Sequence, residues 1–127
     1  MPLSPQHNIV SGAIVDSAFR VHSALGPGLL ESVYELCLAH DLTKRGFEVQ
    51  RQADLPVIFD GLRLEGGFRL DLVVNDLVIV ELKAVDTILP VHKAQLLTYL
   101  KLSGFRLGLL INFNVPLIKQ GIVRLIL

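Results

Sequence analysis

The feature that most constrains the fold is a change in the spacing of apolar residues near residue 46. Before it, apolar side chains recur at helical intervals along 5–25 and 29–45, and Gly26-Pro27-Gly28 must break the helix between these stretches. From Phe47 onward the apolar residues alternate with polar ones, as expected of strands. The alternating segments are residues 47–51, 55–59, 62–64, 68–74 and 78–85.

Helical spacing returns over residues 90–102, and two short strands are expected at 106–112 and 122–126. The order is therefore two helices, a β-meander, a helix and two strands. This order predicts an α/β fold with a central mixed β-sheet flanked by helices. We expect a single domain spanning residues 1–127, because two domains would each be too small to bury a core.

Composition narrows the class of protein. Charged or polar residues interrupt every long apolar stretch, so no membrane span is expected. The first residues lack the basic start and apolar run of a secretory signal, which makes the cytoplasm the expected location. The single cysteine, Cys37, cannot form an intrachain disulfide, and no Cys/His cluster has the spacing of a zinc site.

The charge balance bears on nucleic-acid binding. Twelve Lys and Arg balance twelve Asp and Glu, which argues against a broad basic surface. The charges are unevenly spread, however, because residues 71–127 carry six basic and four acidic side chains. A bound divalent cation would add positive charge that this count omits.

Three charged side chains lie inside a very apolar hairpin formed by residues 68–83. Asp71 is on its first strand, and Glu81 and Lys83 are on its second. Charges in such a setting need a physical reason, because burying them is costly. The even-numbered positions of the second strand are all apolar, so Glu81 and Lys83 share its other face.

The turn decides whether Asp71 joins them. A two-residue turn at Asn75-Asp76 would pair Leu70 with Glu81 and put Asp71 on the wrong side of the sheet. A three-residue loop, 75–77, instead pairs Asp71 with Glu81 and gathers the apolar side chains on the opposite face. We therefore predict an odd-length loop or a bulge. The remaining pairs of this register are Val74 with Val78 and Leu72 with Val80.

Two carboxylates directly opposite each other repel unless a cation or a shared proton lies between them. Hard oxygen ligands of this kind suit Mg²⁺ or Mn²⁺. Such an ion would polarise a phosphate and activate a water, while Lys83 could position that water or neutralise developing charge. The pattern thus points to phosphodiester hydrolysis. The alternative is a structural ion pair between Glu81 and Lys83, with Asp71 as a solvated edge charge.

The sequence resembles the PD-(D/E)xK nuclease superfamily, and more narrowly the small bacterial GxxExxY family, whose name matches Gly28, Glu31 and Tyr34. Leu70 stands where the superfamily name has proline. The resemblance covers nearly the whole chain. It extends over residues 21–28, the Asp71 strand, 81–83, 94–100 and 108–113.

The resemblance implies a restriction-endonuclease-like core and a metal-dependent nuclease that acts on DNA. It implies that Asp71 and Glu81 hold Mg²⁺ or Mn²⁺, aided by Glu31 from the second helix. Lys83 would be the catalytic lysine. Taken without the resemblance, Glu31 could equally be a first-turn acid favoured by the helix dipole.

Gln95 and Tyr99 resemble the Gln-x-x-x-Tyr element that exonuclease-like branches of the superfamily carry on the helix after the lysine strand. A spacing of four puts both side chains on one helical face. Without that context they would be an ordinary polar edge. Lys93 and Lys101, on the same helix, are candidates for phosphate contacts or simply solvated charges.

Two further residues are candidates for lining the site. His22 precedes the break at Gly26, although a lone histidine is more often structural. Tyr34 could also line the site, but the sequence favours a packed aromatic side chain whose hydroxyl finds a local hydrogen-bond partner.

Two other functions stay open at this point. One is a catalytically silent nucleic-acid-binding or accessory protein with the same fold, suggested by the neutral net charge. The other is an interaction protein, because the apolar segment 122–127 is a candidate edge strand for pairing with a second copy in a homodimer.

Overall fold

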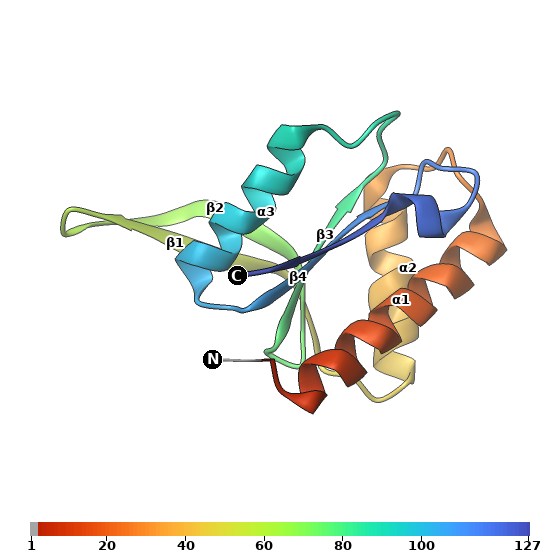
Figure 1. Cartoon of the computed structure of the whole chain (residues 1–127), viewed down its shortest axis with the longest axis horizontal. Coiled ribbons are helices and arrows are strands. Elements are labelled where there is room, and N and C mark those ends of the chain that lie inside the picture. The colour runs from red at the N-terminus through yellow and green to blue at the C-terminus, as the bar shows by residue number, and fades with distance from the viewer. Residues whose placement is uncertain (1–2) are drawn as a thin grey trace.

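The computed structural model describes residues 3–127, which form three α-helices, a short 3-10 helix and one five-stranded sheet (Figure 1). The elements follow the order expected from the sequence, and the α/β fold with a central mixed sheet is confirmed. The elements are α1 (Pro5–Leu25), α2 (Glu31–Lys44), β1 (Val49–Phe59), β2 (Leu62–Val74), β3 (Val78–Lys83), α3 (Pro90–Ser103), β4 (Leu107–Asn112), η1 (Ile118–Gly121) and β5 (Ile122–Ile126).

The strands lie in sequence order across the sheet, from β1 at one edge to β5 at the other. The pairs β1–β2, β2–β3 and β4–β5 are antiparallel, and β3–β4 is parallel. A parallel pair needs a crossover connection, and here α3 supplies it between β3 and β4.

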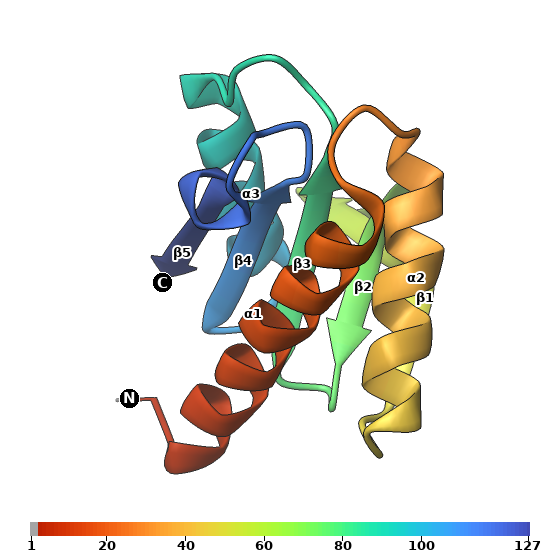
Figure 2. The ribbon, with the colours of Figure 1, turned by 90° about the vertical axis from the view of Figure 1, so that its right-hand side faces the viewer.

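Helices cover both faces of the sheet. Figure 2 shows α1 and α2 side by side on one face, with α3 behind the sheet. Two buried clusters correspond to these layers. Ile14, Leu38 and Leu72 belong to the cluster beneath α1 and α2, whereas Leu96 and Ile79 belong to the cluster beneath α3.

The loop after α1 determines how α2 begins. Gly26 ends α1 with a φ of 72°, and Gly28 has a φ of 96°. Glycine adopts these left-handed values without steric cost, so the chain turns sharply and starts α2 at Glu31.

Of the described helices, none is long and apolar enough to cross a membrane.

The hairpin register is the one predicted from the loop length. Val74 pairs with Val78 and Leu72 with Val80, across the three-residue loop 75–77. Asn75 and Asp76 both have left-handed backbone, with φ of 51° and 52°, which these residue types tolerate.

The prediction of four short strands before residue 74 was wrong. β1 and β2 are each continuous, and their paired ends extend beyond the rest of the molecule as a two-stranded arm (Figure 1). The register shifts between Leu55 and Val57, where Pro56 faces an extra stretch that contains Gly66 with a φ of 68°. Pro56 and Gly66 therefore produce a bulge within the ladder and not a break in the strands.

Candidate active site

Asp71 and Glu81 meet where β2 separates from β3. The backbone pairing ends at Leu72 with Val80, so the next residues need other hydrogen-bond partners. The Asp71 N–H donates to Oε1 of Glu81 at 3.4 Å, and the Leu82 N–H donates to Oδ2 of Asp71 at 2.9 Å. The side chains of the two acids thus take the place of the missing ladder bonds and adjoin each other, as the register predicted.

Glu81 is only 7% exposed. Burial, and then the negative charge of Asp71, raise the pKa of Glu81 to about 9, and the positive charge of Lys83 offsets little of this. Without a cation, Glu81 therefore keeps its proton at neutral pH and hydrogen-bonds through it to Asp71. A proton held by Glu81 is one of the two ways in which opposed carboxylates avoid repulsion, and a bound cation is the other.

Lys83 follows Glu81 on the same strand and is half-buried. Its positive charge opposes the rise in pKa of both Glu31 and Glu81, which places its field at this site. Within residues 3–127, no ion pair joins Lys83 to a carboxylate. The structure therefore does not support the alternative of a Glu81–Lys83 ion pair.

Glu31 approaches the pair from the first turn of α2. Burial, and then the charge of Asp71, raise the pKa of Glu31, although its side chain remains largely in solvent. Tyr34 holds the loop before Glu31, because its hydroxyl donates to the Gly26 carbonyl at 2.6 Å and accepts from the Leu29 N–H at 3.0 Å. The loop that precedes Glu31 is therefore held in place by two hydrogen bonds to Tyr34.

The ring of Tyr34 is fully buried and stacks on Phe113 with centroids 4.5 Å apart. Tyr34 is therefore a packed aromatic with locally bonded hydroxyl, one of the two roles that the sequence suggested for it. Its hydroxyl contacts the loop that precedes Glu31.

Sequence reasoning missed a second set of polar residues beside the pair. Glu35, one turn after Glu31, is 6% exposed and accepts hydrogen bonds from Arg51 at 3.0 Å and Gln52 at 2.6 Å. The same amide nitrogen of Gln52 lies 3.5 Å from Oδ1 of Asp71. The available signal was the spacing of four between Glu31 and Glu35, which puts both acids on one face of α2.

A family model of the PD-(D/E)XK nuclease superfamily matches residues 8–125, a span that contains all of these side chains. The chain belongs to the PD-(D/E)XK nuclease superfamily. No curated protein and no solved structure matches the chain.

On the α3 side, the two residues that resemble a superfamily helix element differ in their surroundings. Tyr99 is buried, and burial followed by the charges of Glu81 and Asp71 raises its pKa, so the hydroxyl belongs to the same electrostatic site. Its ring lies 5.5 Å from that of Phe68 on β2. Gln95, one turn earlier, is exposed.

Three other predicted residues form no hydrogen bond or ion pair with Asp71 or Glu81 within residues 3–127. His22 is buried, with Nε2 at 2.8 Å from the Val115 carbonyl and its ring beside Phe113, and no hydrogen bond of the described chain joins it to Asp71 or Glu81. Lys93 and Lys101 are both exposed on α3. His22 thus helps to hold the segment after β4 against α1.

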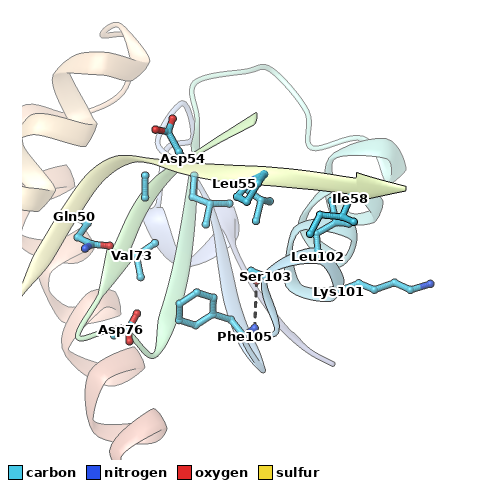
Figure 3. Close-up of a pocket in the computed structure, with 13 residues that line it drawn as sticks. Gln50, Asp54, Leu55, Ile58, Val73, Asp76, Lys101, Leu102, Ser103 and Phe105 are labelled. Atoms are coloured by element: carbon cyan, nitrogen blue, oxygen red, sulfur yellow. Dashed lines mark hydrogen bonds between the residues drawn. The ribbon is translucent and has the colours of Figure 1, made fainter. Parts of the chain in front are cut away.

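Lys101 borders a cavity of about 530 Å³ between β1 and the C-terminal end of α3. Figure 3 shows apolar side chains such as Leu55 and Phe105 around it, with Asp54 and Lys101 at its margin. Asp71, Glu81 and Lys83 do not line this cavity. In this superfamily member the carboxylate pair is therefore separate from that hollow.

Asp71 and Glu81 supply adjacent hard oxygen donors, and a cation would relieve the repulsion that helps to raise the pKa of Glu81. In the described part of the chain, however, no three His, Cys, Asp or Glu side chains gather closely enough to hold a metal ion. The pair fits a cation, but Glu31 is not drawn in as a third ligand.

Proposed function

We propose that the protein is a metal-dependent nuclease that hydrolyses phosphodiester bonds of DNA, with residues 1–127 as a single nuclease-like domain. The observation that carries this proposal is the adjoining pair of half-buried Asp71 and buried Glu81, beside which Lys83 forms no ion pair with a carboxylate of residues 3–127. Membership of the nuclease superfamily supports the same reaction class.

Asp71 and Glu81 would hold Mg²⁺ or Mn²⁺, with Glu31 as the acid available to complete the ligand set. A bound divalent ion supplies a lowered pKa for an attacking water and neutralises charge on the phosphate. Asp71 is held ready by the Leu82 N–H at 2.9 Å, which fixes one of its oxygens against the strand. The site is thus pre-oriented by backbone.

The residues around the pair would act on the substrate. Among residues 3–127 no carboxylate forms an ion pair with Lys83, so its ammonium group can meet a phosphate oxygen or orient the attacking water. Tyr99 and Gln95 present a hydroxyl and an amide from one face of α3. Lys93 and Lys101, exposed on that helix, would contact flanking phosphates.

We also propose that the chain is of the GxxExxY branch, because the motif residues cooperate physically. Gly28 supplies a left-handed φ of 96° that turns the chain into α2. The Tyr34 hydroxyl hydrogen-bonds to Gly26 and Leu29, and the charge of Asp71 acts on Glu31, which begins the helix after this loop. Each named position of the motif thus contributes to presenting one acid to the site.

The test is to incubate purified protein with single- and double-stranded DNA and Mg²⁺ or Mn²⁺. Cleavage is expected for the natural protein and for Lys119→Ala, which removes an exposed lysine of η1 as a matched control. Asp71→Ala and Lys83→Ala should each lose about 100-fold or more of the activity. Cleavage that survives unchanged in both variants would refute the assignment.

A catalytically silent nucleic-acid-binding protein is the second candidate, favoured by the lack of a third clustered metal ligand among residues 3–127. It predicts DNA binding that is independent of divalent ions and no cleavage with any of them. Metal-stimulated hydrolysis in the same assay would exclude it.

A further inference from the structure

Gln52 has an unusual backbone for its place in the fold. Its φ is 51°, and within residues 3–127 it is the only non-glycine residue in a strand with a positive φ, since Asp60, Asn75 and Asp76 lie in turns. Left-handed backbone is sterically unfavourable for a residue with a long side chain. Such strain persists only where contacts with the surrounding residues hold the backbone in this conformation.

The strained residue lies opposite Asp71. The β1–β2 pairing includes Arg51 with Leu72 and Ala53 with Leu70, so Gln52 and Asp71 face each other at the position between them. That position has no ladder pair of its own. The irregularity therefore occurs at the residue that carries the acid of the site.

Both strands change face at this level. Leu70 and Leu72 are two residues apart and would share a face of a regular strand, yet Leu72 packs beneath α1 and α2 while Leu70 packs beneath α3. On β1, Arg51 reaches Glu35 of α2, whereas Ala53 packs beneath α3. The kink thus rotates the strands about the Gln52–Asp71 position, as bulges beside active sites do.

The side chain of Gln52 joins two acids that would otherwise repel. Its amide nitrogen donates to Oε1 of Glu35 at 2.6 Å and lies 3.5 Å from Oδ1 of Asp71. Glu35 is itself held by Arg51 at 3.0 Å. An amide carries two N–H donors and no charge, so it can serve both carboxylates without titrating.

We propose that Gln52 is a positioning residue of the nuclease site: its left-handed backbone turns Asp71 towards Glu81, and its amide links Asp71 to the anchored Glu35–Arg51 pair. The inference rests on the proposed function, because it assigns to Gln52 the orientation of an acid that would hold the divalent ion. A purely structural role would instead affect only the stability of the β1–β2 hairpin.

The test isolates the amide at a retained left-handed backbone by comparing Gln52→Gly, Gln52→Asn and the control Gln50→Gly, on the same strand. Glycine keeps the left-handed φ and removes the amide, whereas asparagine tolerates that φ and keeps a shorter amide. The measurements are Mn²⁺ affinity by calorimetry and the melting temperature without metal. Loss of a residue that orients a metal ligand lowers affinity about 10- to 100-fold.

We expect that loss for Gln52→Gly, a smaller loss for Gln52→Asn and none for Gln50→Gly, with cooperative thermal unfolding for all three variants. A Mn²⁺ affinity of Gln52→Gly within about twofold of the natural protein, well short of the loss seen for ligand-orienting residues, would overturn the proposal. If the natural protein binds Mn²⁺ and the variant binds equally well, only this inference fails. If the natural protein binds none, the proposed function fails with it.

A measurement on the unsubstituted chain guards against a variant that does not fold. In an NMR titration with Mg²⁺, the side-chain amide signals of Gln52 should shift, because Asp71 beside them changes partner. The amide signals of Gln50 and Gln120 should stay in place. Stationary Gln52 signals at saturating Mg²⁺ would count against the proposal just as firmly.

Discussion

Replacing Glu81 by glutamine should stabilise the metal-free protein while removing its response to metal. Glu81 keeps a proton at neutral pH because burial and the adjacent Asp71 raise its pKa to about 9. Glutamine has nearly the shape of a protonated glutamate and can donate to Asp71 through its amide, but it never ionises. The substitution therefore retains the pairing of the folded state and removes a titration.

The magnitude follows from linkage. The pKa of Glu81 rises from 4.5 to about 9 on folding, so the folded state binds this proton more tightly than the unfolded chain does. The contribution of this proton to the free energy of unfolding is therefore fully present below pH 4.5, and it declines as the pH rises towards 9. The loss is roughly 3 kcal/mol at pH 7 and roughly 6 kcal/mol above pH 9, at about 1.4 kcal/mol per pH unit.

The assay is thermal unfolding in a chelator between pH 5 and pH 9 for the natural protein, Glu81→Gln and the control Asp86→Asn, an exposed acid after β3. Glu81→Gln should match the natural protein near pH 5 and exceed it by on the order of 10 °C at pH 8. Added Mn²⁺ should then stabilise the natural protein and leave the variant unchanged. A difference that does not grow with pH would refute the reasoning.

Three smaller predictions follow from named contacts. Mn²⁺ affinity should rise up to about tenfold per pH unit between pH 5 and 9, because binding displaces the Glu81 proton, and calorimetry in buffers of different ionisation enthalpy should detect that proton. Tyr34→Phe, which removes hydrogen bonds of 2.6 Å and 3.0 Å, should cost about 1–3 kcal/mol of unfolding free energy in urea. Gly121→Ala should destabilise the protein far more than Gly108→Ala in the same assay. The new methyl of Gly121→Ala would lie 2.1 Å from the backbone carbonyl oxygen of Asn112, which cannot move easily. The new methyl of Gly108→Ala would lie 2.9 Å from the flexible end of the Leu96 side chain.

The sequence was sufficient to predict the hairpin that carries the site. Side chains alternate along a strand with a period of two, so a loop of three residues leaves one register that buries the apolar positions together. The observed pairing of Leu72 with Val80 is that register. The same count predicts that Asp71 and Glu81 come to neighbouring positions, whereas it does not include the kink that sets the final orientation of Asp71.

The arm was not predictable in the same way. Pro56 and Gly66 are local signals that end strands in most contexts, and they led to an expectation of four short strands. Pairing across the hairpin, with Val57 against Leu64 and Phe59 against Leu62, carries both strands through these positions. Cross-strand contacts outweigh the local conformational preferences of Pro56 and Gly66 here. Such contacts cannot be predicted from residues that are adjacent along the chain.

The network around Gln52 was missed for a different reason. Glutamine has no preference for left-handed backbone, so nothing in the sequence marks a kink at that position. Glu35 and Arg51 are sixteen residues apart and meet only because α2 crosses β1. Residues that position a ligand are recognisable from three-dimensional contacts, whereas residues that carry charge in an apolar strand are recognisable from the sequence.

The charges of the site connect metal binding to substrate binding. Four acids, Glu31, Glu35, Asp71 and Glu81, face two bases, Arg51 and Lys83, so the site is net negative even with Glu81 protonated. A phosphodiester approaching it would be repelled, and the neutral chain offers no broad basic surface to compensate. A divalent ion that displaces the proton would add one net positive charge and offset the remaining negative charge. DNA affinity should therefore increase when Ca²⁺ is added, in the natural protein but not in Asp71→Asn, and equal affinity with and without the ion would contradict this coupling.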